Sequence, residues 1–273
     1  MKTLTLVPYG GLANRIYAIT SSIGFCKENN VQLKIIWFKD KGIGAGFYNL
    51  LRLSSDLKNI KVVDAKWHDY RYDRPRKKNL WLPFVWQFFA FGKRIYMKDF
   101  PELISKGLSP YISCKSLYMI HCGLYYEWVD QFKSLLPERN IQTRIKEEIK
   151  AFANQRTIGV HIRRSDLPAS IINSPLFLFI NKIKEELKKD LQTKFFVASD
   201  SNEEKLKLKE LFGDAIITSF KEIRRDTEEG IVDALTELYM LSLTEKIYGT
   251  SYSTYSTLAA QLSGIPIEIL SLK

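Results

Sequence analysis

The hydrophobic pattern of residues 151–273 alternates between short apolar runs and longer segments with helical spacing. The apolar runs predict strands at residues 157–162, 194–198, 215–218, 246–249 and 266–270. The amphipathic segments between them predict helices at residues 175–191, 203–212, 229–243 and 253–262. Strict alternation of strands and helices at these lengths indicates a parallel sheet that helices cover on both faces.

The first half of the chain opens with a similar unit. A strand over residues 3–9 ends at Gly10-Gly11, a helix follows over residues 12–28, and a second strand covers residues 31–38. The other predicted elements are helical stretches around residues 47–57 and 141–153 and a basic loop at residues 67–78. We therefore predict an α/β protein in which two Rossmann-type, doubly wound halves face a cleft. The predicted domains are residues 1–150 and 151–273, with the boundary near residues 150–156.

Composition is that of a globular protein, and the charge is uneven. The chain has 273 residues, 45% of them hydrophobic and 26% charged, with a formal net charge of +11. Residues 1–150 hold 25 Lys and Arg against 13 Asp and Glu (+12), and residues 151–273 hold 16 against 17 (−1). A basic first half suggests an anionic partner: nucleic acid, a membrane surface or a phosphorylated substrate. Three cysteines without regular spacing give no disulfide framework and favour a reducing compartment.

No segment is predicted to span a membrane or to act as a signal peptide. The apolar run before Pro8 is too short for a signal sequence. The densest apolar stretch, residues 80–91, has about a dozen residues, whereas a spanning helix needs about 20. We therefore expect a cytoplasmic protein, either soluble or peripheral at the inner membrane face.

Ligands of doubly wound sheets bind at the carboxyl ends of the strands. That rule selects four polar loops, at residues 10–15, 161–166, 199–202 and 250–256. Because the four occur together, they predict a site more strongly than any one of them does.

The loop at residues 161–166 carries the first candidate for a phosphate ligand. The side chain of Arg163 is expected on the same face as Gly159 and His161, at the mouth of a buried strand. An arginine there is costly unless it meets an anion, and a guanidinium binds phosphate through two parallel hydrogen bonds. Arg164 faces away and is expected to pair with Asp166 or to hold the loop. The alternative is a structural ion pair of an arginine with Asp166.

Two further loops precede predicted helices, where free backbone N–H groups can bind an anion. Residues 250–256 supply hydroxyls there, and plain N-capping by Ser251 or Ser253 is the alternative. The loop at residues 10–15 has neither the Gly-x-Gly-x-x-Gly spacing nor a P-loop lysine. Its glycines allow close backbone approach, and Asn14 and Arg15 follow at the positive end of the helix dipole. A tight turn with a solvated arginine is the alternative.

Three carboxylates complete the candidate set. Asp200 follows a buried strand, where it accepts hydrogen bonds from a sugar hydroxyl or caps the next helix. Asp233 and Glu237 are four residues apart on one helix face, where a carboxylate can bind the N1–H and N2–H₂ groups of guanine. A solvated helix face is the alternative for one of these two. His68 and His121 lie in irregular segments and are expected to be structural.

The order and content of these motifs resemble the fucosyltransferase superfamily that includes the α1,2- and α1,6-fucosyltransferases, the nodulation fucosyltransferases and the protein O-fucosyltransferases. The motifs that carry the resemblance are Gly10-Gly11-Leu12-Ala13-Asn14-Arg15, His161-x-Arg163-Arg164-x-Asp166, FFVASDS at residues 195–201, and residues 251–259 with Glu237 upstream. The resemblance implies a GT-B-like fold, with an acceptor-side first domain and GDP-fucose held mainly by the second. It implies inverting transfer from GDP-β-L-fucose to a glycan hydroxyl, without a required metal or other cofactor.

The resemblance also implies roles for individual residues. Arg163 would bind the donor diphosphate and His161 would position the nucleotide. Glu237 would bind the guanine base, with Asp233 as its competitor. The β-phosphate would receive hydrogen bonds from Ser253 and its neighbours Ser251, Tyr252 and Thr254. The diphosphate or the fucose would be reached from the first half by Gly11, Asn14 and Arg15.

The sequence departs from the family at two places. Ala13 and Arg15 stand where glycine and glutamine are common in the α1,2 group. Residues 167–170 lack the acidic residue that follows the His-x-Arg-Arg-x-Asp motif in the α1,6 type, so the general base stays open. Asp166 is the first candidate for it. The weaker candidates are Glu127, Asp130 and Asp73.

The chemistry of the candidate residues also supports transfer from a nucleotide sugar, because preorganised arginine and backbone N–H groups stabilise a leaving diphosphate. Because the sequence contains no Asp-x-Asp motif, we do not expect a dedicated metal site. The basic, aromatic region at residues 67–98 suggests a lipid-pyrophosphate-linked acceptor and peripheral membrane contact, with a helix buried against the core as the favoured alternative for residues 81–91. Two rival functions are a GT-B transferase for another nucleotide sugar and a non-catalytic, basic polyanion-binding protein. No RNA-binding signature is present, so we do not expect nucleic acid as the partner.

Overall fold

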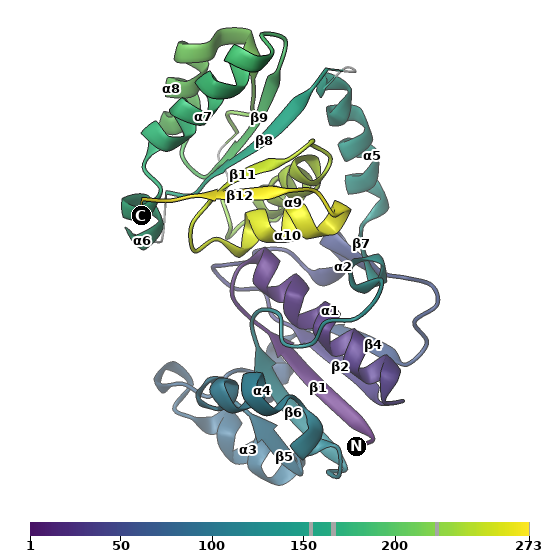
Figure 1. The fold of residues 1–273 in the computed structure, drawn as a ribbon. Coiled ribbons are helices and arrows are strands. Elements are labelled where there is room, and N and C mark those ends of the chain that lie inside the picture. Colours follow the sequence, from purple (N-terminus) through teal and green to yellow (C-terminus); the bar gives the residue numbers. More distant parts are fainter. Residues whose placement is uncertain (153–154, 165–167, 222–223, 273) are drawn as a thin grey trace. The chain divides into compact units, whose positions relative to one another are not determined.

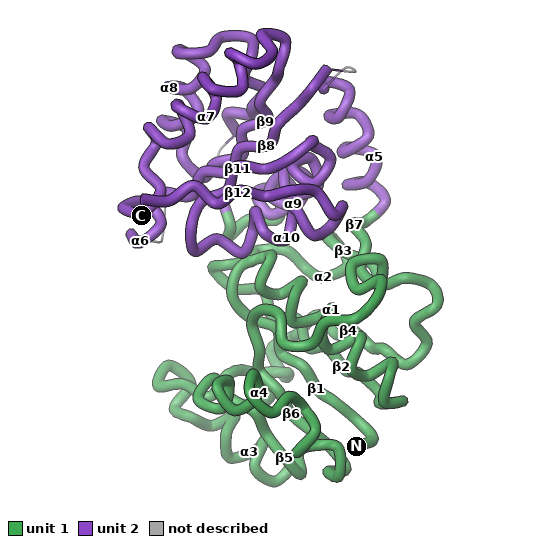
Figure 2. Tube along the Cα trace, in the orientation of Figure 1, with its two compact units in different colours: residues 1–138, 225–228 green, residues 139–224, 229–273 purple. Residues whose placement is uncertain are grey.

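The computed structural model describes residues 1–152, 155–164, 168–221 and 224–272. It divides into two compact units, coloured separately in Figure 2. Unit 1 is Met1–Glu138 with Arg225–Glu228, and unit 2 is Arg139–Arg224 with Glu229–Lys273. The assignment of acceptor and donor roles to these two parts of the chain stays a prediction.

Unit 1 is built on a parallel five-stranded sheet with the order β4-β2-β1-β6-β5. Its strands are β1 (Thr3–Pro8), β2 (Gln32–Trp37), β4 (Ile60–Asp64), β5 (Lys93–Ile95) and β6 (Ser116–His121). The predicted strand–helix–strand unit is confirmed as β1, α1 (Leu12–Glu28) and β2 (Figure 1). The pattern did not reveal β4, β5 and β6, of which β5 is too short to show an alternation.

The remaining elements of unit 1 are short. They are α2 (Phe47–Leu50), β3 (Leu51–Leu53), η1 (Trp67–Tyr72), η2 (Lys77–Asn79), α3 (Leu82–Ala90), η3 (Met97–Asp99), α4 (Phe100–Lys106), η4 (Ser109–Tyr111), η5 (Gln131–Ser134) and β7 (Leu135–Pro137). The helix predicted around residues 47–57 is wrong beyond Leu50, because the chain there pairs as β3 with β7 in an antiparallel ladder. This pairing partner lies more than eighty residues away, so a local pattern could not show it.

Unit 2 holds a second parallel five-stranded sheet, in the order β10-β9-β8-β11-β12. Its strands are β8 (Thr157–Ile162), β9 (Lys194–Ser199), β10 (Ile216–Ile217), β11 (Ile247–Thr250) and β12 (Ile267–Leu270). Its helices are α5 (Arg139–Glu148), η6 (Ile149–Phe152), α6 (Pro168–Asn173), α7 (Leu176–Lys189), α8 (Asn202–Phe212), η7 (Gly213–Ala215), α9 (Glu228–Ser242) and α10 (Thr254–Ser263). Every strand predicted for the second half is confirmed, and so is the parallel arrangement.

The two faces of β8 explain why helices cover both sides of this sheet (Figure 1). Ile158, Val160 and Ile162 pack on one face in a core that includes Phe179 of α7. On the other face, a Cβ atom added to Gly159 would lie 2.8 Å from Thr244 Oγ1 and 3.0 Å from Leu241 Cδ2, at the end of α9. Gly159 thus lets α9 approach the sheet closely.

We expect Gly159→Ala to lower the free energy of unfolding by about 1–3 kcal/mol, because the new methyl group overpacks a filled interface. The midpoint of denaturant unfolding measures this effect. Gly11→Ala is the matched control, since Gly11 has a φ of −71° and no atom within 4 Å of an added Cβ. Equal midpoints for Gly159→Ala and the wild type would contradict this account of the close approach.

Candidate functional site

Hydrogen bonds join the carboxyl ends of three neighbouring strands of unit 2. The Thr250 hydroxyl, at the end of β11, donates to the carbonyl oxygen of His161 at 2.8 Å. The backbone N–H of Arg163 donates to the same hydroxyl oxygen at 3.2 Å, and that of Arg164 donates to Asp200 Oδ1 at 2.7 Å. The predicted loops after β8, β9 and β11 therefore lie together at one edge of the sheet, which fixes the backbone at Arg163 and Arg164 from both sides.

Arg164 holds this loop in place. Its Nε lies 2.6 Å from Glu204 Oε1 on α8, and both side chains are largely buried. Arg163, one residue earlier, is half-buried at the strand end. The expected partner Asp166 lies outside the described residues, so its role as pair or base stays a prediction. The structure thus gives Arg164 a partner that the sequence analysis did not name.

Asp200 supports the loop rather than capping α8. Its carboxylate accepts from the backbone of Arg164, while Ser201 occupies the N-cap of α8 and its Oγ accepts from Glu204 N–H at 3.4 Å. The expectation that Asp200 caps this helix is therefore wrong. A carboxylate at this place orients the strand end, and its predicted bond to a sugar hydroxyl stays a prediction.

The amino end of α10 has the properties of an anion site. Ser253 is its N-cap residue, yet no side-chain capping bond forms. The Oγ atom of Ser253 is buried and has no hydrogen-bond partner in the part of the chain that the structure describes. No acidic residue lies in the first helical turn. A buried hydroxyl at the positive, amino-terminal end of a helix suits a negatively charged oxygen.

The neighbours of Ser253 differ in what they can offer. Ser251 is committed to the fold, because its N–H donates to Ser174 Oγ at 3.0 Å and its carbonyl accepts from Ser170. Tyr252 is exposed and adopts a left-handed backbone with φ of 59°. Thr254 is exposed in the first turn of α10. Side-chain capping by Ser251 or Ser253, the alternative considered above, is therefore not how this helix begins.

A ring stack connects this edge to α9. The imidazole of His161 stacks on Tyr255 of α10, with ring centroids 4.8 Å apart and an interplanar angle of 30°. The Tyr255 hydroxyl donates to the carbonyl oxygen of Ala234 in α9. Sequence analysis did not single out Tyr255, although it lies within the hydroxyl-rich loop at residues 250–256. The contacts place α9 residues next to the candidate site.

Asp233 and Glu237 are both buried, so a solvated face is wrong for either. Asp233 forms an ion pair with Arg144 of α5. Glu237 has only Lys205 Nζ, 3.7 Å away, as an ion-pair partner among the described residues. Burial raises the pKa of Glu237 to about 7; the negative charges of Asp233 and Glu148 add to this rise and Lys205 opposes it. Glu237 is thus the less committed carboxylate of the two.

In unit 1, Arg15 is a support of the glycine loop. Its side chain is fully buried, and its Nη2 lies 2.8 Å from Asp40 Oδ2. Nε donates to the carbonyl of Gly10 at 3.0 Å, and Nη1 donates to that of Phe38 at 2.6 Å. Burial lowers the pKa of Arg15 to about 10, against the opposing charge of Asp40. The solvated arginine considered above is therefore wrong.

The same loop presents an open backbone. Gly10 has a φ of +86°, which favours glycine, and no atom lies within 4 Å of a Cβ added to Gly11. The carbonyl of Asn14 accepts from Gly123 N–H at 3.0 Å. Direct contacts of Gly11, Asn14 and Arg15 with a donor stay predictions.

His121 does not lie in an irregular segment, as the sequence suggested, but at the end of β6 beside this loop. Its carbonyl accepts from Tyr9 N–H at 3.1 Å. Its ring lies between Phe100 and Tyr125, with centroids 4.3 and 4.6 Å away. Burial lowers the pKa of His121 to about 4, and an interaction with the Gly123 backbone opposes this only in part. A neutral, buried ring agrees with the structural role expected of it.

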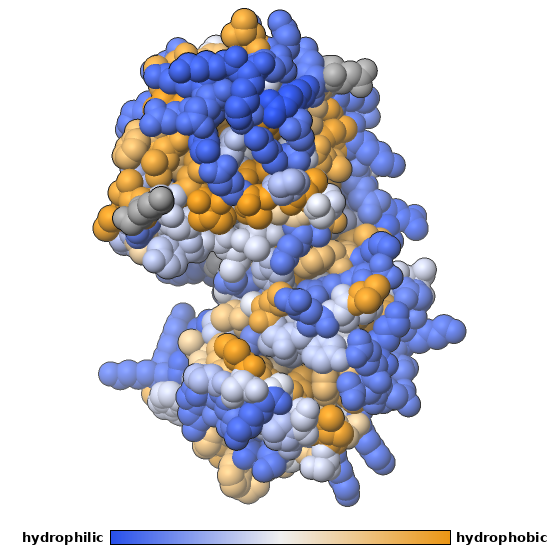
Figure 3. Space-filling model, viewed as in Figure 1, coloured by the Kyte–Doolittle hydropathy of each residue, from blue (hydrophilic) through white to orange (hydrophobic). Residues whose placement is uncertain are grey.

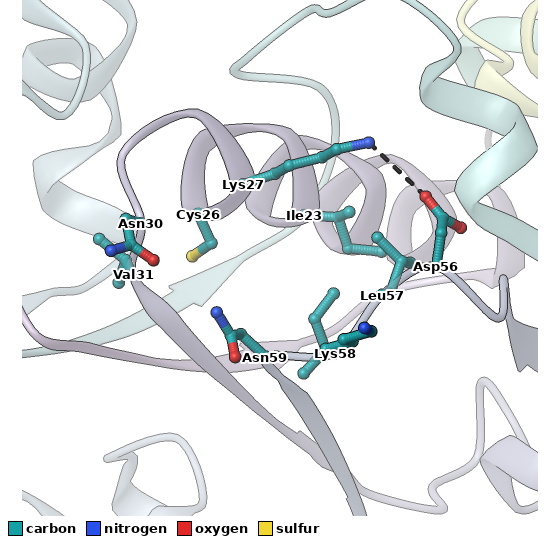
Figure 4. Close-up of a pocket in the computed structure, with 10 residues that line it drawn as sticks. Ile23, Cys26, Lys27, Asn30, Val31, Asp56, Leu57, Lys58 and Asn59 are labelled. Atoms are coloured by element: carbon teal, nitrogen blue, oxygen red, sulfur yellow. Dashed lines mark ion pairs between the residues drawn. The ribbon is translucent and has the colours of Figure 1, made fainter.

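A small cavity of about 170 Å³ in unit 1 is not a candidate for the site (Figure 4). Its lining includes Cys26 and Lys27 at the end of α1, Val31 before β2, and Ile60 at the start of β4. These positions mark the amino edge of the sheet, opposite the edge where Gly10 lies. The candidate residues are therefore not part of this cavity.

Among the described residues, no group of three His, Cys, Asp or Glu side chains could hold a metal ion, and metal independence stays a prediction. No helix within the described ranges is long and apolar enough to cross a membrane.

Comparisons with known proteins identify the fold. No family model matches the sequence, and no curated protein matches it. The NodZ α-1,6-fucosyltransferase from Bradyrhizobium, co-crystallised with GDP, is similar in structure with a TM-score of 0.67 and 16% identity, over 96% of this chain and 92% of NodZ. POFUT1 in complex with GDP has a TM-score of 0.60 and 12% identity, over 99% and 98% of the two chains. A single-residue mutant of Arabidopsis thaliana FUT1 in complex with GDP has a TM-score of 0.61 and 13% identity, over 97% of this chain and 70% of that chain.

These similarities extend over nearly the whole chain and include both five-stranded sheets. The predicted α/β, GT-B-like fold is thereby confirmed. The chain has the fold of the GT-B-like fucosyltransferases.

Proposed function

We propose that this protein is an inverting glycosyltransferase that moves L-fucose from GDP-β-L-fucose to a hydroxyl of a glycan acceptor. The fold shared with NodZ, which was crystallised with GDP and soaked with GDP-fucose, supports a GDP-sugar donor. The observation that carries the proposal is the edge of unit 2 at which Arg163 and the uncapped start of α10 follow adjacent strands.

The donor diphosphate is proposed to bind at this edge. Arg163 supplies a planar cation, and Ser253 with the first-turn N–H groups of α10 supplies neutral donors. His161 and Tyr255 form a stacked pair next to these groups, which positions the nucleotide. Glu237 accepts from the N1–H and N2–H₂ groups of guanine when it is ionised.

In the proposed reaction the bond between fucose C1 and the β-phosphate oxygen breaks, and a bond from the acceptor oxygen to C1 forms on the opposite face. GDP leaves with the electron pair, and the acceptor hydroxyl loses its proton to a base. Arg163 and the α10 N–H groups stabilise the charge that develops on the leaving diphosphate, the task that a metal ion performs in other enzymes. Asp166 stays the predicted base, and the residues described here do not include it.

Calorimetric titration with GDP, GDP-fucose, UDP and ADP tests the proposal. We expect GDP and GDP-fucose to bind at least about tenfold more tightly than UDP or ADP, because only guanine offers two donors to a carboxylate. Donor hydrolysis across GDP-, UDP- and ADP-sugars is the second readout. Preference for another nucleotide would show a different donor. Equal, weak and strongly salt-dependent binding of all polyanions, without turnover, would favour a basic binding protein instead.

A further inference from the structure

Helix α3 packs on the protein through Gln87, Pro83 and Trp86. Gln87 is fully buried, and its amide Nε2 donates to the carbonyls of Arg71 and Asp73 at 2.9 and 3.0 Å. Its Oε1 accepts from the Tyr96 hydroxyl at 2.9 Å. The rings of Trp86 and Tyr72 pack edge to face, with their centroids 5.0 Å apart. A glutamine bound to two backbone carbonyls thus fixes which side of the helix faces inward.

The apolar side of α3 consequently faces solvent. Its exposed side chains are Leu82, Phe84, Val85, Phe88 and Phe89, and the preceding Leu80 and Trp81 are exposed as well. Phe89 is 82% exposed and Leu80 76%. The helix buried against the core, favoured above for residues 81–91, is therefore confirmed for one side only, where Pro83 and Gln87 are buried and Trp86 packs on the core. Large contiguous apolar surfaces are rare on soluble proteins and mark interaction sites.

The backbone before α3 is held in an unusual conformation. Leu80 and Trp81 both have left-handed backbones, with φ of 50° and 59°. For residues with a Cβ this conformation costs roughly 1–2 kcal/mol each. Neither side chain enters the core, so burial of these side chains does not offset the free-energy cost of the backbone conformation. Two consecutive strained residues that present large apolar side chains to solvent point to a partner outside the chain.

Cations border these apolar side chains. Lys77 and Lys78 precede the helix and Lys93 follows it, all exposed. Arg94 lies over the ring of Phe88, with its Cζ 4.8 Å from the centroid. Residues 67–98 contain eight Lys and Arg against two Asp, a net of +6. Figure 3 shows light orange side chains at the lower edge of unit 1, where Figure 1 labels α3, with blue ones beside them.

We propose that residues 77–94, the α3 surface, bind peripherally to the interface of an anionic phospholipid bilayer. Aromatic and leucine side chains insert among the acyl chains and headgroups, while the flanking lysines and Arg94 contact lipid phosphates. A second copy of the chain fits less well, because an isologous interface would bring the two basic borders together. This proposal goes beyond the proposed function and does not depend on the donor.

Flotation of the full chain with lipid vesicles tests the proposal. With vesicles of phosphatidylcholine and about 30% phosphatidylglycerol, we expect the wild type to float, and to remain mostly unbound with pure phosphatidylcholine. Phe88→Ser with Phe89→Ser should lower the partition coefficient at least about tenfold, since two apolar side chains lose their burial in lipid. Lys77→Gln with Lys78→Gln should lower it about thirtyfold at low salt, at about 1 kcal/mol per lysine near the surface.

The matched control replaces exposed leucines outside this surface, Leu191→Ser with Leu211→Ser, and should float as the wild type does. Circular dichroism and thermal unfolding confirm that each variant folds, which the exposure of the replaced side chains favours. Light scattering of the wild type without lipid completes the experiment. Absence of flotation with anionic vesicles, or flotation unchanged by the phenylalanine variant, overturns the proposal. A dimer that the same variant dissociates would assign the surface to self-association and overturn it as well.

Discussion

Arg163→Ala is expected to reduce turnover of GDP-fucose by about 10²–10³-fold, the loss that follows removal of one preorganised donor to a developing negative charge. The backbone of Arg163 is fixed by the Thr250 hydroxyl, and the next residue is fixed by Asp200 and Glu204. Because the backbone is held at both residues, the guanidinium of Arg163 starts from a fixed position at the strand end. The binding free energy of GDP should weaken by about 1.5–3 kcal/mol, the contribution of a hydrogen bond to a charged group. Single-turnover kinetics and calorimetry measure the two effects.

Two variants separate this explanation from a general loss of charge. Arg163→Lys keeps the charge and loses the planar fork, so we expect an intermediate activity. Lys207→Ala removes an exposed cation of α8 in the same unit, whose pair with Glu203 lies on the surface, and should leave turnover unchanged. Full GDP affinity in Arg163→Ala would show that the donor binds elsewhere and that the Arg163–Arg164 pair is structural.

The pattern of the second half predicted its architecture because each strand there is a compact apolar run between amphipathic helices. The strand order β10-β9-β8-β11-β12 was not predicted, because right-handed crossovers are compatible with more than one order of a doubly wound sheet. In the first half, β5 and β6 have no helical segments of comparable length around them. Their strand character depends on pairing with β1 and with each other, which only the folded chain shows.

The candidate loops were predicted correctly as neighbours in unit 2, but their internal bonds were not. Arg164 meets Glu204, forty residues away, and Asp200 meets the Arg164 backbone across two strand ends. Such contacts depend on side-chain rotamers at the sheet edge, and the sequence contains several acidic residues that could pair with Arg164. The same limit explains why a solvated Arg15 was considered, whereas Asp40 and two carbonyls hold it in the interior.

Helix α3 shows a different limit. Hydropathy establishes that a segment is apolar, and burial is the usual consequence. Here the one polar side chain of the helix, Gln87, donates to backbone carbonyls inside the protein, so the helix is fixed with most of its apolar side chains outward. The one feature of the sequence that could have indicated this orientation is the single glutamine, Gln87, in an otherwise apolar run.

The affinity for GDP is expected to rise about tenfold between pH 6 and pH 8 through the ionisation of Glu237. Burial, the first cause, places the pKa of this carboxyl at about 7 in the folded protein. Guanine N–H groups need the ionised acceptor, so the apparent affinity scales with the ionised fraction, which is about one tenth at pH 6 and nine tenths at pH 8. An ordinary carboxylate is already ionised at pH 6 and would give no change in this range. Calorimetry in buffers matched for ionic strength measures it.

Glu237→Gln is the decisive comparison, because the phosphates of GDP also titrate and do so equally with both proteins. At pH 8 the variant should bind GDP with a binding free energy about 1.5–3 kcal/mol weaker than that of the wild type. At pH 6 the ratio of the two affinities should be about tenfold smaller, because the wild type has lost most of its ionised Glu237. Asp233→Asn provides the matched control. Since the charge of Asp233 contributes to the raised pKa of Glu237, this variant should move the midpoint of the pH profile downward and keep its height. If Glu237→Gln and wild type instead follow the same pH profile, guanine does not bind this carboxylate and lies at another part of the sheet edge.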